Sequence, residues 1–297
     1  MKNTADVRKD NIVQILNIIR DGKEHTVLSV SKSTGLSVAT CNTLLKMLVN
    51  KNQAIGTKKQ LNGIGRSSVV YRINNEYFKY LSVKYLQGDK KLQLQLNYLY
   101  GNNICECEFD LDGFDSDFII NKVNNYVKEK GILSAILVSL PLSYWDKTKE
   151  IEEKIQKDTN IKTFVSNKYN FIAKGYEEDG LNTLVDLKTI NPIVINIKNN
   201  DLLAGKKLQR VNYDLLFGDI NNIDNLARSI AINILYSFPD VVTIVGDIDL
   251  NQLKAAMAPY TESPLPEFKK IDEINSACEK GIGKYAVDIL IDLGLKQ

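Results

Sequence analysis

The sequence lacks the features that mark secreted, membrane-spanning and disordered proteins. Its four cysteines have no paired spacing, so we expect reduced thiols in a cytoplasm rather than a disulfide framework. The longest apolar run, residues 132–142, is interrupted by serines and is about half of the ~20 residues that a membrane span needs. The N-terminus shows no basic and apolar leader with a cleavage site. These absences predict a cytoplasmic protein that does not enter membranes.

Length and composition are those of an ordinary globular protein. The chain has 297 residues, of which 44% are hydrophobic and 25% are charged. These values exclude a collagen-like or largely disordered chain. They leave room for one small domain and one larger or bilobal domain.

Charge is unevenly distributed along the chain. Residues 1–80 hold 13 Lys and Arg against 5 Asp and Glu, a net charge of +8. The remainder holds 38−13 = 25 against 36−5 = 31, a net charge of −6. A basic module joined to an acidic one suits a head that binds phosphates and a body that DNA repels. We expect the affinity of such a head for DNA to fall steeply with salt.

Residues 26–52 have the spacing of a helix-turn-helix. Gly35 gives the backbone the freedom to end one helix and turn sharply. Ser37 can then cap the next helix by accepting a hydrogen bond from one of its first amides. Two helices that meet at such a corner are the usual DNA-binding unit, although a solvated amphipathic helix in any small bundle gives the same local pattern.

The second of these helices divides into two faces. Its apolar residues recur at helical spacing and predict a stripe that faces a small core: Cys41, Leu44, Leu45, Leu48 and Val49. The opposite face and the N-terminal end predict the surface that enters the major groove: Ser37, Val38, Thr40, Asn42, Thr43 and Lys46. An asparagine can bond an adenine edge, and a threonine can donate, accept or touch a thymine methyl group.

The flanking sequence predicts a winged helix. Ile12, Ile15, Leu16 and Ile19 predict a first helix, and residues 53–58 and 67–73 predict two strands around a turn-rich segment. Lys58, Lys59 and Arg66 lie in or beside this wing and are candidates for contacts with phosphates or a minor groove. Residues 1–78 are therefore predicted to be a winged helix-turn-helix DNA-binding domain, which we call the head.

The remaining residues, 79–297, are called the body. Residues 80–86, 91–100 and 104–109 predict an antiparallel meander, followed by a helix at 118–130 and a strand at 132–140 whose unbroken hydrophobicity indicates burial on both faces. Helix and strand then alternate to 241–245, and helices near 252–258 and 271–290 close the chain. This order is typical of an actin-like or hexokinase-like (ribonuclease H-like) bilobal α/β fold. The whole chain is thus predicted to be a multi-domain α/β protein.

The chain resembles the ROK family of repressors, open reading frames and kinases, and in particular its sugar-responsive (NagC/XylR-like) repressors with an N-terminal winged helix. The segments that carry the resemblance keep the family's order along the chain: residues 26–37, 65–74, 98–101, 138–141, 165–167 and 241–246. The resemblance implies a sugar-kinase-like body.

This sequence departs from the family where the family's chemistry lies. In the family's kinases an Asn is followed by an Asp, and this Asp acts as the general base. In this sequence Asn167 is followed by Lys168. The first phosphate loop corresponds to residues 81–85, which hold neither Asp nor Gly, and the second is expected after strand 193–197, where residues 198–201 hold no glycine. Phosphoryl transfer depends on positioning and charge stabilisation, so we expect no enzymatic activity.

The resemblance also implies a zinc site that this sequence cannot form. The family's site uses a His and a Cys-rich segment, but the single histidine, His25, lies in the head, where we expect a surface residue. Cys105 and Cys107 are two apart on a predicted strand, share one face and are expected to pack in the core. A metal would need two further ligands. We therefore expect no metal and no cofactor.

The predicted function is that of a sequence-specific regulator of transcription, a repressor that binds double-stranded DNA as a homodimer. Its body would serve dimerisation and respond to a small-molecule effector, with Asn167 as the one candidate ligand residue that survives from the family pattern. The alternative is a winged helix that binds another protein, or a body that senses a ligand other than a sugar. An active sugar kinase ranks third.

Overall fold

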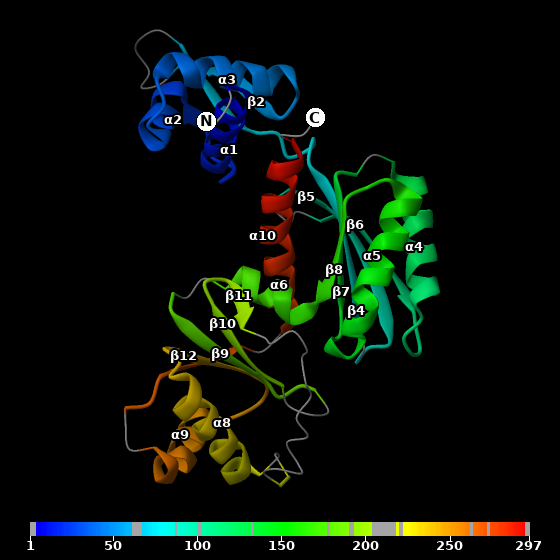
Figure 1. The fold of residues 1–297 in the computed structure, drawn as a ribbon, viewed down its shortest axis with the longest axis vertical. Coiled ribbons are helices and arrows are strands. Elements are labelled where there is room, and N and C mark those ends of the chain that lie inside the picture. Colours follow the sequence, from blue (N-terminus) through cyan, green and yellow to red (C-terminus); the bar gives the residue numbers. More distant parts are fainter. Residues whose placement is uncertain are drawn as a thin grey trace. The chain divides into compact units, whose positions relative to one another are not determined.

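A computed structural model describes residues 4–60, 67–86, 88–99, 103–131, 133–176, 179–189, 193–203, 218–219, 222–261, 264–271 and 274–294 (Figure 1). The chain forms two compact units. Unit 1 contains Met1–Asn167 together with Gly283–Gln297, and unit 2 contains Lys168–Ile282. The predicted boundary between the head (residues 1–78) and the body (residues 79–297) lies within unit 1. The division into head and body therefore stays a prediction.

The N-terminal part of unit 1 is a three-helix bundle with a small sheet. Its helices are α1 (Thr4–Ile19), α2 (Val27–Thr34) and α3 (Val38–Asn50). The strands β1 (His25–Thr26), β2 (Ala54–Lys59) and β3 (Ser68–Ile73) form one antiparallel sheet in the order β1-β3-β2. The predicted first helix contributes Ile15, Leu16 and Ile19 to the core with no exposed surface. The winged helix-turn-helix architecture is therefore confirmed.

The second sheet of unit 1 combines a meander with two parallel strands. Strands β4 (Lys79–Leu86), β5 (Lys91–Tyr98) and β6 (Asn103–Asp110) are antiparallel. Strands β7 (Ala135–Leu140) and β8 (Thr163–Asn167) extend the sheet in parallel, in the order β6-β5-β4-β7-β8. All six residues of β7 are buried, as its unbroken hydrophobicity predicts.

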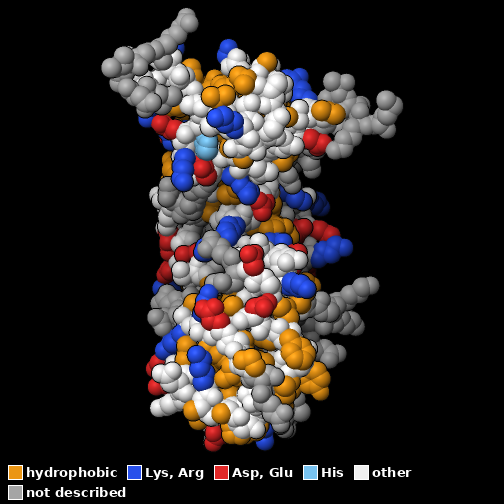
Figure 2. All heavy atoms as spheres, turned by 90° about the vertical axis from the view of Figure 1, so that its left-hand side faces the viewer, with side chains coloured by type: hydrophobic (Ala, Val, Ile, Leu, Met, Phe, Trp, Pro, Cys, Tyr) orange, Lys and Arg blue, Asp and Glu red, His pale blue; other side chains and the backbone are white. Residues whose placement is uncertain are grey.

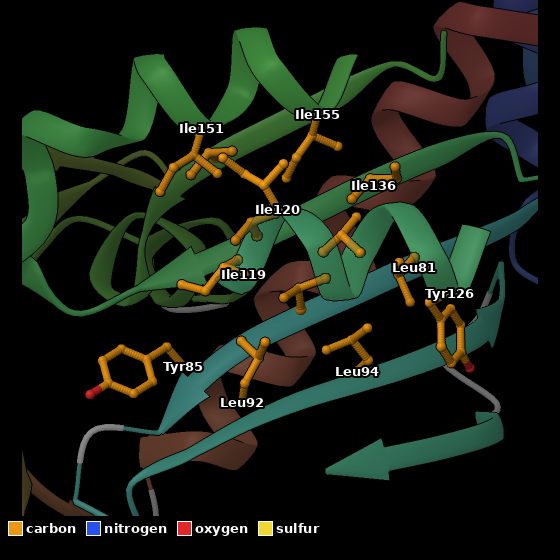
Figure 3. Packing of buried hydrophobic residues seen from close by; sticks show 14 of the residues in the cluster. Leu81, Tyr85, Leu92, Leu94, Ile119, Ile120, Tyr126, Ile136, Ile151 and Ile155 are labelled. Atoms are coloured by element: carbon orange, nitrogen blue, oxygen red, sulfur yellow. The ribbon is translucent and has the colours of Figure 1, made fainter. Parts of the chain in front are cut away.

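Two helices cover one face of this sheet. Alternation along β4 and β5 turns Leu81, Leu92 and Leu94 toward α4 (Ser116–Lys130) and α5 (Thr148–Thr159), which is preceded by the 3-10 helix η1 (Leu142–Lys147). In Figure 3, Ile119 and Ile151 from the helices point into the same apolar layer as these leucines. This layer is the core of the unit 1 body.

Unit 2 contains a sheet of its own. Strands β9 (Leu181–Asp186), β10 (Ile193–Lys198) and β11 (Asp201–Leu203) are antiparallel, and β12 (Val241–Val245) and β13 (Glu267–Ile271) continue in parallel from β9. Helices α8 (Ile223–Ser237) and α9 (Leu250–Met257) pack on this sheet, and the 3-10 helix η2 (Ala258–Tyr260) follows α9.

The two body sheets have the same topology. Numbered along the chain, the strands of each lie in the order third, second, first, fourth, fifth, because unit 2 runs β11-β10-β9-β12-β13. Among the described residues, an α-helix lies between the third and fourth strands of each sheet (α4 and α8), and another lies between the fourth and fifth (α5 and α9). A helix follows each fifth strand, α6 (Lys168–Gly175) after β8 and α10 (Ile274–Gly294) after β13. This repeat confirms the bilobal α/β fold.

Within unit 2, α6 and α10 approach each other closely through glycine. A Cβ atom added to Gly281 would lie 1.6 Å from the backbone oxygen of Phe171, and one added to Gly175 would lie 2.8 Å from the amide nitrogen of Gly281. Only residues without a side chain permit this approach.

Several elements differ from the sequence-based expectations. Helix α6 and strands β11 and β13 were not predicted. The helix predicted at 271–290 begins at Ile274, because Ile271 is the last residue of β13. Strand β7 begins at Ala135 rather than at residue 132.

Candidate nucleic-acid interface

The corner between α2 and α3 is built by capping residues. Gly35 has φ +72°, and its N–H donates to the carbonyl oxygen of Ser31 at 2.9 Å, which ends α2. A Cβ on Gly35 would meet no atom within 4 Å, so the backbone angle rather than space requires glycine. Ser37 then accepts a hydrogen bond from the Thr40 amide at 3.1 Å and starts α3. The sequence therefore fixes the direction in which α3 leaves the corner.

Helix α3 buries one face and exposes the other, as predicted. Cys41, Leu44, Leu45 and Leu48 are at most 4% exposed. On the other face Ser37, Thr43 and Lys46 are exposed, and Asn42 is half-buried. Val38 is a large apolar side chain left 49% exposed at the first helical position. The N-terminal end of α3 is thus an accessible surface with both polar and methyl groups.

The two threonine hydroxyls of α3 are already engaged within the helix. The Thr40 hydroxyl lies 2.8 Å from that of Ser37, and Thr43 Oγ1 donates to the Ala39 carbonyl oxygen at 3.0 Å. Ala39, directly before Thr40, is also exposed, and sequence reasoning missed it. The exposed turn therefore presents methyl groups from Val38, Ala39 and Thr43, while the Asn42 amide is the side chain best suited to bond a base edge.

The wing contributes cations on β2. Lys58 is exposed, and Lys59 Nζ lies 2.7 Å from Glu24 Oε2 in an ion pair whose side chains are 49% and 39% exposed. Such an exposed pair is weak, so Lys59 can exchange Glu24 for a phosphate. Arg66 lies outside the described residues.

His25 is not the ordinary surface residue that we expected. Its side chain is 17% exposed, and its Nε2 lies 2.8 Å from Asp21 Oδ1. Burial pushes the pKa of Asp21 upward, but hydrogen bonds from His25 and from the Lys23 amide outweigh burial and leave that pKa below its usual value. His25 in β1 pairs in register with Tyr71 in β3. Through its contact with Asp21, it therefore links this sheet to the segment that follows α1.

In unit 2, the lysine that stands where family kinases have a base is held in an ion pair. Lys168 Nζ lies 3.1 Å from Asp186 Oδ2, and the Tyr169 hydroxyl donates to the same oxygen at 2.8 Å. Asp186 has no exposed surface, and its Oδ1 accepts from the Lys188 amide at 3.1 Å. An ammonium group has donors but no acceptor, so Lys168 cannot take a proton from a sugar hydroxyl.

The sheet repeat relocates the second phosphate loop expected from sequence. The resemblance assigns the first phosphate loop to residues 81–85, which lie in β4, the first strand of the unit 1 sheet. The topologically equivalent strand in unit 2 is β9, not β10. The equivalent turn is therefore residues 187–192 rather than 198–201. Its sequence, Leu-Lys-Thr-Ile-Asn-Pro, also has no glycine, and part of it lies outside the described residues.

The two unit 1 residues at the corresponding positions, Lys84 and Asn167, supply no carboxylate for a metal ion. Lys84 in β4 is 3% exposed and pairs in register with Ser139 of β7. Asn167, the candidate ligand residue, ends β8 fully buried. These residues do not fit a magnesium ion, which prefers carboxylate oxygens.

Cys105 and Cys107 are half-buried beside the core rather than within it. Both pack against the apolar cluster of unit 1, and Cys105 Sγ lies 3.1 Å from the Tyr126 hydroxyl. Burial raises the pKa of the Cys107 thiol, which disfavours the thiolate that binds metals. Among the described residues, no three His, Cys, Asp or Glu side chains are grouped to hold a metal ion. Within the same residues, no helix has the length and hydropathy to cross a bilayer.

Comparison with known proteins identifies a DNA-binding family for the N-terminal region. Residues 8–53 match the model of the winged helix-turn-helix DNA-binding family. No curated protein matches the sequence.

The fold is similar to solved structures of ROK family proteins. A ROK family transcriptional regulator, a homolog of the E. coli MLC protein, has a TM-score of 0.68 at 15% identity, covering 98% of this chain and 98% of that chain. A ROK family protein from Streptococcus pneumoniae TIGR4 in complex with sucrose has a TM-score of 0.50 at 12% identity, covering 71% of this chain and 98% of that chain. A ROK hexokinase from Thermus thermophilus has a TM-score of 0.49 at 14% identity, covering 74% and 99%.

The likeness to the regulator establishes the fold. The chain has the architecture of a ROK family transcriptional regulator over nearly its full length, with a winged helix-turn-helix ahead of a bilobal α/β body. The resemblance inferred from sequence is thereby confirmed at the level of the fold.

Proposed function

We propose that this chain is a sequence-specific DNA-binding regulator of transcription, and specifically a repressor, that acts in the cytoplasm. The head, residues 1–78, reads the DNA, and the body, residues 79–297, serves dimerisation and binds a small-molecule effector. The observation that carries this proposal is the accessible N-terminal end of α3, held in place by the Gly35 and Ser37 caps on a winged-helix core.

Several residues have assigned roles in this proposal. Asn42 and Thr43 contact bases, with Val38 against a thymine methyl group and Thr40 supporting the cap. Ser37 and Lys46 contact DNA phosphates that flank the major groove. Lys58, Lys59 and Arg66 contact phosphates beside the wing. The net charge of +8 in residues 1–80, from 13 basic and 5 acidic residues, supplies the attraction.

We propose further that the body has no kinase activity. The Lys168–Asp186 ion pair supports this, because it replaces a proton acceptor by a fixed cation. The proposal does not name the chemical class of the effector. A sugar is disfavoured, because this sequence lacks the other residues with which the family contacts sugars. Asn167 is the remaining candidate ligand residue. A coupled ATPase assay with a panel of hexoses tests the claim. Turnover that Asn167→Ala abolishes would contradict it.

The test of DNA reading compares Asn42→Ala and Thr43→Ala with a matched control. Asn50, the last residue of α3, is also exposed, so Asn50→Ala removes a similar amide from the end of the helix that does not enter the groove. The duplex is first selected by the wild-type protein from a random pool. We expect Asn42→Ala and Thr43→Ala to weaken binding to this duplex by about 1 to 3 kcal/mol, with little effect on random DNA.

Asn50→Ala should bind as the wild type does. Equal losses on selected and random DNA for all three variants would show that α3 is not the base reader. If the folded protein selects no duplex at all, the winged helix is a protein-binding module instead.

A further inference from the structure

Two thiols of unit 1 lie on the same face of the edge strand β6. Cys105 and Cys107 are separated by one residue, so both side chains point to the face of the sheet that α4 covers. Both are free thiols of intermediate exposure, and β6 is the outermost strand in the order β6-β5-β4-β7-β8. The pair therefore lies at the rim of the core, where a small ligand from solvent can reach it.

A cavity of about 290 Å³ lies beside the two cysteines, which both line it. Helix α4 supplies Tyr126 to the same cavity. Tyr126 is 7% exposed, and its hydroxyl lies 3.1 Å from Cys105 Sγ. In Figure 3 the Tyr126 ring reaches from α4 toward the strands of the meander. A tyrosine hydroxyl can donate to a thiolate, so this buried group is placed to stabilise a metal-bound sulfur of Cys105.

The spacing of the two thiols does not suit a disulfide. Cys105 and Cys107 pair in register with Leu96 and Leu94 of β5, so the strand is regular between them. Two residues of a strand span about 6.6–6.8 Å, and side chains that point the same way keep their Cβ atoms about as far apart. A disulfide needs Cβ atoms about 3.5–4.5 Å apart. The two sulfurs therefore cannot join unless the ladder breaks.

The same spacing suits a metal ion held by two ligands in a line. Two metal–sulfur bonds of roughly 2.3 Å place the sulfur atoms about 4.6 Å apart, so each thiol needs to lean by only about 1 Å toward the other. Zinc would need four ligands, and among the described residues no three His, Cys, Asp or Glu side chains are grouped. Soft Cu(I) prefers thiolates and accepts two of them.

We propose that Cys105 and Cys107 bind one soft monovalent metal ion, Cu(I), between their sulfur atoms. Binding forms two copper–sulfur bonds and releases the two thiol protons, and neither copper nor sulfur changes its oxidation state. Burial raises the pKa of the Cys107 thiol, so the metal displaces a proton that is present at neutral pH. The complex of two thiolates with one monovalent cation carries one negative charge.

Lys122 is placed to offset that charge. It lines the cavity, and its Nζ lies 4.2 Å from the centre of the Phe109 ring, which holds the ammonium group on the cavity wall. Lys130 also lines the cavity but is paired with Glu129 at 2.7 Å. The carboxylate of Glu106 accepts hydrogen bonds from glutamines of β5 on the other face of the sheet. Lys122 is therefore the cation that we assign to the site.

The experiment is an anaerobic titration of the reduced full-length protein with Cu(I) against a chromophoric Cu(I) chelator. We expect one tightly bound Cu(I) per chain, with two sulfur ligands in X-ray absorption spectra. Loss of an outer-shell partner typically costs about 10- to 100-fold in metal affinity, so Tyr126→Phe should weaken binding about tenfold. Cys105→Ala and Cys107→Ala remove a ligand and should each weaken binding by about 100-fold or more.

Two controls separate this site from other copper ligands. Cys41 and Cys278 are buried thiols elsewhere in the chain, so the double variant Cys41→Ala, Cys278→Ala should bind Cu(I) as the wild type does. His25, the single histidine, is pale blue at the surface drawn in Figure 2, and copper can bind there adventitiously. His25→Gln should leave the tight site unchanged.

The inference fails if the wild type binds Cu(I) no more tightly than Cys105→Ala does, or if the Cys41 and Cys278 double variant loses as much affinity as Cys107→Ala. Three or more ligands in the X-ray absorption spectrum of the wild type would also overturn it, and this measurement does not depend on the folding of any variant. All of these tests are made without DNA, so their outcome is independent of the proposed function.

Discussion

The head and the body retain different parts of the folds that they resemble. In the head, Gly35 and Ser37 shape the fold and position an exposed surface on α3. In the body the strand order is kept twice, yet Lys168 is tied to Asp186 and the turn after β9 lacks glycine. Positions that build a fold are thus separable from positions that perform chemistry, and likeness of fold speaks only for the former.

The largest expected loss of stability comes from forcing α6 and α10 apart where their backbones meet at Gly281. Gly281→Ala places a Cβ 1.6 Å from the Phe171 carbonyl oxygen, so α6 and α10 must separate. We expect a loss of more than about 3 kcal/mol in the free energy of unfolding, measured by urea denaturation. The control is Gly283→Ala in the same helix, where the nearest atom is the Tyr80 hydroxyl at 3.7 Å. It should gain about 0.5–1 kcal/mol, because alanine favours helix interiors. Similar stability of the two variants would contradict this packing.

The next prediction tries to restore chemistry to the body. Lys168→Asp returns a carboxylate to the position of the family's base but places it beside the buried Asp186. We expect a destabilisation of about 2 to 3 kcal/mol, because a buried carboxylate loses its cation and gains a like charge. Lys168→Met, which only removes the cation, should cost less. Neither variant should turn over ATP with any hexose. Turnover by Lys168→Asp would contradict the claim that the body has lost more of the family's chemistry than this one residue.

Much of the head was predictable because its signals are local. Ser37, Gly35 and the apolar spacing of α1 and α3 lie within a few residues of the contacts that they make. In the body, α6 and β11 have only eight and three residues, and three of the five residues of β13 (Glu-Phe-Lys-Lys-Ile) are charged. Such short or polar elements depend on tertiary contacts for their stability and leave no clear pattern in sequence.

The site was predictable as a set of residue types but not as a set of contacts. The sequence identifies Thr43 and Lys46 as exposed, but it shows neither that Asn42 is half-buried nor that the Thr43 hydroxyl donates to the Ala39 carbonyl oxygen. The Lys168–Asp186 pair joins residues 18 positions apart, so no local pattern reveals it. The turn equivalent to the one after β4 could not be located from sequence for a similar reason, since the strand order in the sheet had to be known first.

A smaller effect tests the cap on which the head depends. Ser37→Ala removes the oxygen that accepts from the Thr40 amide. We expect a loss of about 1 kcal/mol in stability, measured by thermal unfolding. Ser33→Ala is the control, because Ser33 is exposed within α2. An equal change in both variants would show that the cap does not set the stability of α3.

The smallest predicted effect concerns methyl groups at the DNA surface. Replacing thymine by deoxyuridine in the selected duplex removes a methyl group and leaves base pairing intact. Because Val38, Ala39 and Thr43 present methyl groups, we expect binding to weaken by about 0.8 kcal/mol at each contacted thymine. Val38→Ala should lose less on this replacement than the wild type does. Identical affinity for thymine and deoxyuridine duplexes would mean that α3 reads hydrogen bonds alone.

The central claim is that the head reads DNA, and the most direct measurement is fluorescence anisotropy of the full-length protein over a range of salt concentrations. The probes are the selected duplex and a random duplex of equal length. We predict at least 10³-fold tighter binding to the selected duplex and a logarithmic affinity that falls linearly with the logarithm of salt concentration, by about 0.9 for each phosphate contacted. A folded protein that binds both duplexes equally, or binds neither, would contradict the account.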